Sequence, residues 1–170
     1  MAEAGGGRSL SLVTDANVWI DLDNGGLTAL VFALGYEFVS PDTVVDELGP
    51  DLAGRLLDQG LLSHSAGPES GAALLELRSR YKHPSDADLY ALLLAIEQGW
   101  GLLTGDRQLR EAAQGQQLEV HGLLWVLDEL VARRLLAVRA AARALTTIRE
   151  QGARLPADEC DERLLRWGTT

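Results

Sequence analysis

The stretch that decides the fold is KHPSDADLYALLLAIEQGWGLLTGDRQLR, residues 82–110. Residues 89–96 are apolar or aromatic without interruption, so a helix here has no polar face and must be covered on most sides. The run is far shorter than the roughly 20 apolar residues that a membrane span needs. Gly99 marks the end of the helix, and residues 101–104 follow as a short buried strand. The pattern predicts a helix and a strand at the centre of an α/β protein.

Acidic residues stand on both sides of this central helix and strand. Asp86 and Asp88 open the helix, and Asp106 lies at the corner between the strand and a helix predicted over residues 107–114. Taken singly, each acid is typical of a helix terminus, because Ser85 and Asp88 have the spacing of a capping box and Asp106 would favour the helix dipole. The residues alone leave a structural and a functional interpretation open, and only the whole set of acids favours the second.

Two further acids follow strand-like segments earlier in the chain. Asp15 ends the apolar run 10–14, and Glu47 lies on a predicted helix, 41–48, that follows strand-like residues 36–40. In an open parallel sheet the carboxyl ends of the strands share one edge, which is where such folds place their sites. The carboxylates that we expect to converge at that edge are Asp15, Glu47, Asp88 and Asp106.

Several carboxylates in one cleft need a compensating positive charge, because like charges raise one another's pKa values. No lysine or arginine within these motifs is placed to pair with all of them. A divalent cation is the simplest solution, and an all-oxygen ligand set without Cys or His at zinc spacing favours Mg²⁺ or Mn²⁺. Such an ion suits phosphodiester hydrolysis, where it activates a water and stabilises charge on the phosphate.

At these residues, over about 10–131, the chain resembles the PIN-domain nucleases. The resemblance rests on four short motifs that occur in the order the family has them. They are its D-x-N after the opening strand, its E-L, its S-x-x-D before an Ala- and Leu-rich helix and its T-x-D corner, matched here by Asp15-Ala16-Asn17, Glu47-Leu48, Ser85 to Asp88 and Thr104-Gly105-Asp106. Each motif is weak alone, but the ordered set is specific.

The resemblance assigns metal binding and catalysis to one quartet of acids, Asp15, Glu47, Asp88 and Asp106. Asp86 is the rival of Asp88 for the third position, and we favour Asp88 because the helix phase after it, with Ala95 facing inward, fits the family better. The residues that we expect to support the quartet are Asn17, Ser85, Asp86 and Thr104. One or two bound ions are both compatible with this set.

The resemblance also implies a fold and a setting. PIN domains have a central parallel sheet flanked by helices, which we expect over residues 9–134, with extra C-terminal helices over 135–170 packed on the same domain. Residues 1–8 are expected to form a mobile tail. Many bacterial members are VapC-like toxins of toxin–antitoxin pairs that cut RNA, so an RNA substrate, an antitoxin protein and a homodimer are the candidate partners. The RNA target, the antitoxin and the oligomeric state do not follow from the sequence.

Composition and charge narrow the class of protein further. The 170 residues, 46% hydrophobic and 24% charged, are typical of one globular domain. The net charge of −10 counts against a broad nucleic-acid-binding surface, although a bound divalent ion reverses the field locally. Lys82, Arg107, Arg110 and the basic stripe that includes Arg139 could supply a small basic rim, and His83 with Lys82 could meet a phosphate backbone. A single cysteine, Cys160, and the absence of an export-signal pattern indicate a cytoplasmic protein without disulfides.

Two other classes of function compete with the nuclease. The first is a non-catalytic partner-binding module, in which the acids cap helices and the apolar C-terminal helices form an interface. It predicts that metal ions leave the melting temperature unchanged. The second is a phosphoacceptor domain of receiver type, which would need a lysine at the last strand, and residues 118–121 contain none. We therefore favour the nuclease.

Overall fold

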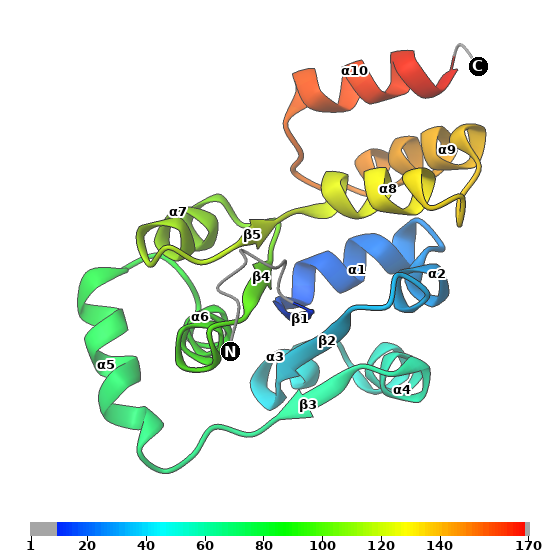
Figure 1. Cartoon of the computed structure of the whole chain (residues 1–170). Coiled ribbons are helices and arrows are strands. Elements are labelled where there is room, and N and C mark those ends of the chain that lie inside the picture. The colour runs from blue at the N-terminus through cyan, green and yellow to red at the C-terminus, as the bar shows by residue number, and fades with distance from the viewer. Residues whose placement is uncertain (1–9, 169–170) are drawn as a thin grey trace, which may run out of the picture.

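A parallel sheet in the order β3-β2-β1-β4-β5 runs through the middle of the molecule in the computed structural model, which describes residues 10–168 (Figure 1). The strands are β1 (Ser11–Thr14), β2 (Glu37–Pro41), β3 (Leu62–His64), β4 (Gly101–Leu103) and β5 (Val120–His121). Every pair of neighbours in the sheet is parallel. The predicted open parallel α/β fold is confirmed, and the tail predicted over residues 1–8 lies outside the described residues.

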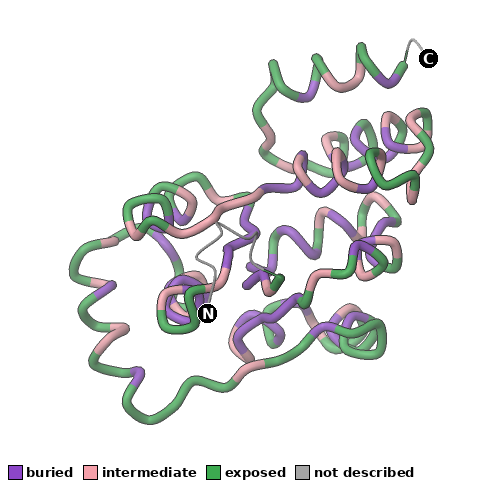
Figure 2. The backbone as a smooth tube through the Cα atoms, in the orientation of Figure 1, coloured by how far each residue is buried: buried purple, intermediate pink, exposed green. Residues whose placement is uncertain are grey.

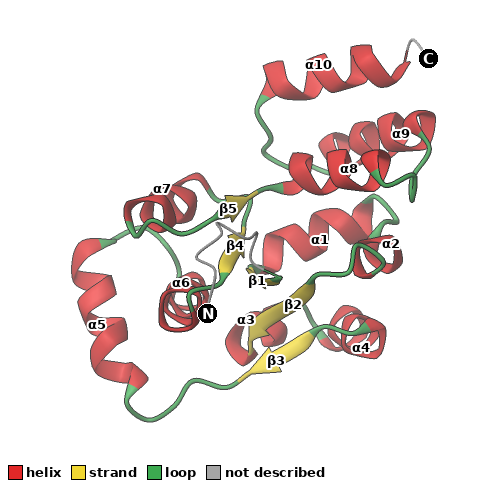
Figure 3. Ribbon diagram, viewed as in Figure 1, coloured by secondary structure: helices red, strands yellow, loops and turns green. Residues whose placement is uncertain are grey.

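Helices cover both faces of the sheet (Figure 3). In chain order they are α1 (Ala16–Asn24), α2 (Thr28–Phe32), α3 (Asp42–Glu47), α4 (Pro50–Gln59), α5 (Ser70–Arg80), α6 (Asp86–Gln98), α7 (Arg107–Gly115), α8 (Leu123–Ala132), α9 (Val138–Glu150) and α10 (Ala157–Gly168). Across the described chain, every helix is too short or too polar to cross a lipid bilayer.

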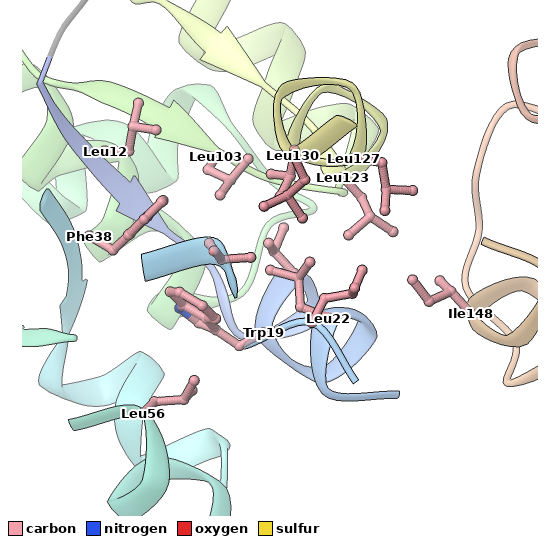
Figure 4. Packing of buried hydrophobic residues seen from close by; sticks show 14 of the residues in the cluster. Leu12, Trp19, Leu22, Phe38, Leu56, Leu103, Leu123, Leu127, Leu130 and Ile148 are labelled. Atoms are coloured by element: carbon pink, nitrogen blue, oxygen red, sulfur yellow. The ribbon is translucent and has the colours of Figure 1, made fainter. Parts of the chain in front are cut away.

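The two faces of the sheet bury different residues, because successive side chains of a strand point to opposite sides. One face carries Leu12, Phe38 and Leu103, which pack with α1, α2, α4, α8 and α9 (Figure 4). The other face carries Val13, Val39 and Leu102, which pack with α5, α6 and α7. The parallel register pairs Leu12 with Phe38, and it pairs Val13 with both Val39 and Leu102. The result is a helix–sheet–helix sandwich.

Helix α6 is the central helix that its sequence predicts. Leu89 and residues 91–95 are buried, as are most residues of the neighbouring strands β1 and β4, which Figure 2 shows in purple. It ends at Gly99, whose φ of 67° lies in the left-handed region that glycine adopts without strain. Two residues later, a Cβ on Gly101 would lie 2.7 Å from Cδ2 of Leu12, so β4 approaches β1 more closely than a larger residue would allow.

The start of α3 differs from the prediction of a helix over residues 41–48. Pro41 instead ends β2, and α3 begins at Asp42. The Ser40 hydroxyl is buried and lies 2.5 Å from the hydroxyl of Thr14 on the neighbouring strand. A contact between strands has therefore taken the side chain that could have capped the helix.

The C-terminal helices share the core of the sheet domain. Leu145 and Ile148 of α9 are fully buried in the cluster that contains Leu12, and α9 packs against both α1 and α8. Helix α10 lies on α9 and is tied to α8 by Arg163, whose Nε donates to both oxygens of the Asp128 carboxylate at 3.0 and 3.1 Å and whose Nη2 donates to Oδ2 at 2.6 Å. The last two helices are thus integral to the packing of residues 10–168.

Candidate active site

Asp15 occupies the carboxyl end of the central strand, where β1 runs into α1. The register pairs Thr14 with Leu103, so the next residues of the two strands, Asp15 and Thr104, come side by side. The Thr104 hydroxyl donates a short hydrogen bond to Oδ2 of Asp15, and the Val18 backbone N–H donates to Oδ1 at 2.9 Å. Asp15 is only 1% exposed. Its carboxylate is therefore held in one orientation inside the protein.

Burial makes the Asp15 carboxylate reluctant to ionise. The pKa of Asp15 is raised from 3.8 to about 6, mainly by burial and to a smaller extent by the negative charge of Asp88. Hydrogen bonds from Thr104, Val18 and Gly105 act in the opposite direction but do not cancel the effect of burial. An incompletely compensated buried carboxylate is a typical feature of functional sites, and a cation is the partner that would complete it.

Asp88 interacts electrostatically with both Asp15 and Glu47. It lies in the first turn of α6, where Oδ2 accepts a hydrogen bond from the Ser85 N–H and the Ser85 hydroxyl accepts one from the Asp88 N–H, both at 3.1 Å. Its charge acts on Asp15 and also on Glu47. Three carboxylates from three separate elements therefore share one local electric field.

Glu47 is the exposed member of this group. It lies at the end of α3, which packs against α6, and partial burial together with the charge of Asp88 raises the pKa of its carboxyl. Asp86, the rival of Asp88, is bound instead by Arg78 at 2.5 Å, with a side chain that is 77% exposed. This ion pair favours Asp88 as the acid that belongs to the site.

Asp106 is linked to Asp15 through the hydroxyl of Thr104. That hydroxyl donates to the Asp15 carboxylate and accepts from the Asp106 backbone N–H at 3.0 Å. The Asp106 carboxylate caps α7 by accepting from the Leu109 N–H at 2.8 Å. Asn17 is exposed on α1, and its side chain makes no hydrogen bond within residues 10–168. Thr104 is thus the supporting residue that the structure joins most directly to the predicted acids.

The donor chemistry of this edge fits a hard divalent cation, although the side chains do not form a closed ligand shell. Within residues 10–168, no three acidic, His or Cys side chains are close enough together to hold one ion. Asp15, Asp88 and Asp106 each use one carboxylate oxygen to cap a helix. All three keep further oxygen lone pairs. The assignment of the quartet as metal ligands therefore stays a prediction.

Two residues beside this edge were missed by the sequence reasoning. Asp21 is half-buried on α1, with a carboxyl pKa raised by burial, and it lines a cavity together with Asn17, Asp106 and Arg154. The spacing of Asn17 and Asp21 was a usable signal, because residues four apart share one face of a helix. Arg154 is distant in sequence from every motif and carried no such signal.

An open parallel α/β sheet with acidic side chains gathered where its strands end defines a class of protein whose site lies at that edge. A family model described as a PIN domain, DUF3368, matches residues 11–169, and the chain belongs to this family, which is in general one of nucleases. The family predicted from the four motifs is confirmed. The receiver-type interpretation is therefore set aside.

One solved structure with a similar fold is a PilT N-terminus domain protein, SSO1118, from the hyperthermophilic archaeon Sulfolobus solfataricus P2. It is 15% identical in sequence, and the alignment covers 69% of this chain and 91% of that one with a TM-score of 0.46. A comparison with curated proteins found no match.

Proposed function

We propose that the protein is a metal-dependent endoribonuclease that hydrolyses RNA phosphodiester bonds with Mg²⁺ or Mn²⁺. The observation that carries the proposal is that the charge of Asp88 acts on both Asp15 and Glu47, so acids from three elements influence one another near the carboxyl edge of the sheet. The backbone N–H of Asp106 is linked to the Asp15 carboxylate through the Thr104 hydroxyl. Membership of the PIN-domain family supports the same chemistry.

We propose different roles for the three acids, because they differ in burial and in hydrogen bonding. Asp15 is buried and doubly hydrogen-bonded, so it is the fixed ligand of the proposed metal site. Asp88 is half-buried and influences both of its neighbours, whereas Glu47 is exposed and can adjust its position. When bound, the ion supplies an activated water and stabilises the charge of the phosphate. The protein contributes a preorganised set of oxygen donors.

Attraction of RNA to a chain of net charge −10 needs local positive charge. Lys82 and His83 line a surface hollow of about 450 Å³ between the α5–α6 turn and α7, directly before the Ser85 corner. Both side chains are exposed, and we propose that they meet the phosphate backbone of the substrate.

The direct test is cleavage of single-stranded RNA in Mn²⁺ or Mg²⁺. We expect cutting by the wild-type chain, and loss of cutting in chelator and in Asp88→Asn and Asp106→Asn. The matched control is Asp46→Asn, which removes an exposed charge next to Glu47 and should leave cutting intact. Melting temperatures of all variants show whether each is folded. Cutting by Asp88→Asn and Asp106→Asn at the wild-type rate would rule out the proposed site.

A non-catalytic partner-binding module is the second candidate, and a specific observation favours it. Asp15, Asp88 and Asp106 all cap helices, which is sufficient to explain why an acid stands at each position. Metal titration separates the two functions. Mn²⁺ at a hundred times its Kd should stabilise a nuclease by about 2.7 kcal/mol and should leave a simple binding module unchanged.

We further propose that this nuclease is the toxin of a toxin–antitoxin pair, that it acts in the cytoplasm and that it forms a homodimer. The single cysteine, Cys160, is buried and leaves no disulfide that would require an oxidising compartment. The toxin role predicts that expression arrests growth and that Asp88→Asn relieves the arrest. The homodimer predicts twice the chain mass in sedimentation equilibrium. Growth at the normal rate, or a monomer at all concentrations, would contradict the respective proposal.

A further inference from the structure

A cavity of about 310 Å³ opens beside Asp106, at the end of the sheet that carries the candidate active site. Its walls come from three parts of the chain that are far apart in sequence. Asn17 and Asp21 of α1 form one wall, the Gly105–Asp106 corner forms the second, and the linker between α9 and α10, residues 152–155, forms the third. The volume lies at the lower end of the roughly 300–1,000 Å³ that ligand pockets occupy.

The linker is held in place by the helix before it. Ile148 of α9 is fully buried in the core, and its side chain lies against Gly25 at the end of α1. The Gly152 N–H donates to the Arg149 carbonyl at 3.0 Å, and the Ala153 N–H donates to the Ile148 carbonyl at 3.3 Å. These contacts keep the linker beside α1 and make it a fixed wall.

Arg154 is the residue of the linker whose chemistry stands out. Its side chain is exposed and lines the cavity, yet within residues 10–168 it makes no hydrogen bond or ion pair, although Asp21 and Asp106 line the same cavity. Several other arginines are paired with carboxylates, as in Arg55 with Asp23, Arg149 with Asp161 and Arg163 with Asp128. A guanidinium left without a partner beside the candidate site is available to an incoming anion.

We propose that Arg154 binds a backbone phosphate of the RNA strand and that the 152–155 linker forms one wall of the substrate cleft. This inference rests on the proposed nuclease function and adds a substrate-binding residue to it. A guanidinium presents a planar fork of donors that matches two phosphate oxygens, and such charge-assisted bonds are among the strong ones.

The carboxylates that line the same cavity increase the expected contribution of Arg154 to RNA binding. Asp21 and Asp106 repel a bare phosphate, and the chain as a whole is strongly acidic. The attraction that draws the strand into the cavity must therefore come from Arg154 and from a cation bound at the neighbouring acids. Removing the arginine should weaken RNA binding more than the loss of one unit of charge elsewhere on the surface.

The test compares Arg154→Ala with Arg143→Ala in the full chain. Arg143 is an exposed arginine of α9 that does not line the cavity, so both changes alter the net charge equally. The first readout is fluorescence anisotropy of a labelled single-stranded RNA in chelator, where metal-dependent cleavage is off, over a range of salt concentrations. The second readout is KM and kcat for RNA cleavage in Mn²⁺.

We expect Arg154→Ala to raise Kd and KM about tenfold with little change in kcat, and to flatten the slope of log K against log salt by about 0.7, the value for one phosphate contact on a single strand. Arg154→Lys should recover part of the affinity, because it keeps the charge but loses the fork. Arg143→Ala should change Kd less than twofold.

The possible outcomes separate the two proposals. Cleavage by the wild-type chain with equal Kd and KM for Arg154→Ala and Arg143→Ala overturns the role of Arg154 and leaves the nuclease function standing. RNA binding that depends on Arg154 without any cleavage supports the phosphate contact and refutes the nuclease. A wild-type chain that binds no RNA by either readout overturns the inference.

Discussion

Replacing Asp15 with asparagine should stabilise the metal-free protein at neutral pH. Asp15 is 1% exposed, and burial raises the pKa of its carboxyl from 3.8 to about 6 in spite of hydrogen bonds from Thr104 and Val18. The ionised form is therefore held in a place that favours the neutral form. An asparagine is neutral at every pH and keeps the size of the side chain.

The sign and size of the effect follow from proton linkage. Below about pH 4 the folded and unfolded chains both carry the proton, and the stability that the raised pKa contributes is fully present. As pH rises from 3.8 towards about 6, the unfolded chain loses the proton while the folded chain keeps it, so stability falls. Each pKa unit corresponds to about 1.4 kcal/mol, so the two units or so amount to about 3 kcal/mol at pH 7.

The assay is urea unfolding of the wild-type chain and Asp15→Asn in chelator, at several pH values between 4 and 7. The gain in unfolding free energy should be near zero at about pH 4 and should grow to about 3 kcal/mol at pH 7, which corresponds to a rise of about 6–12 °C in Tm. Asp46→Asn removes an exposed charge and should change stability by no more than about 0.5 kcal/mol. A gain from Asp15→Asn that does not vary with pH, or a loss at pH 7, would refute the burial argument.

Three further predictions concern a hydrogen bond in the site and two contacts in the core. Thr104→Val should lower stability at neutral pH by about 1.5–3 kcal/mol, because the Asp15 carboxylate loses its hydroxyl donor, and it should shift the fall in stability to higher pH; an unchanged pH profile of urea unfolding would contradict it. Ile148→Ala should cost about 2–5 kcal/mol, whereas exposed Thr147→Ala should cost little, and equal losses of Tm in the two would show that α9 is not part of the core in solution. Gly101→Ala should cost about 1–3 kcal/mol through its clash with Leu12, and calorimetry that finds no loss would disprove the close approach of β4 to β1.

Much of the fold could be predicted because it follows from the types of residues that are neighbours in the chain. The uninterrupted apolar run of residues 89–96 predicts a buried helix, and the strand–corner–helix order around Asp15 and Asp106 predicts a parallel sheet with acids at its edge. These features depend on residues that are neighbours in the chain. The prediction that α3 begins at Pro41 was wrong because the start of this helix depends on a distant residue. The Ser40 hydroxyl contacts Thr14 on another strand and does not cap the helix.

The positions of the acids in the candidate site could be predicted from the sequence, but the contacts that join them could not. The corners place Asp15, Asp88 and Asp106 at helix starts, as expected, but no local pattern reveals that the Thr104 hydroxyl joins two of those corners. The cavity wall at Arg154 depends on how α9 packs across α1. Contacts of this kind arise only when distant segments meet, and a single sequence does not encode them in any short spacing.

The double use of three aspartates, as helix caps and as candidate ligands, determines which substitutions can be interpreted. Alanine at Asp15, Asp88 or Asp106 would remove the acceptor of a backbone N–H at a helix start, at about 0.5–2 kcal/mol each, so that a loss of activity could reflect local fraying. Asparagine caps a helix about as well as aspartate and lacks only the charge. Alanine substitutions of these three aspartates would therefore mix a loss of helix stability with a loss of metal binding. Asparagine substitutions would remove the charge and keep the cap, so they would separate the two effects.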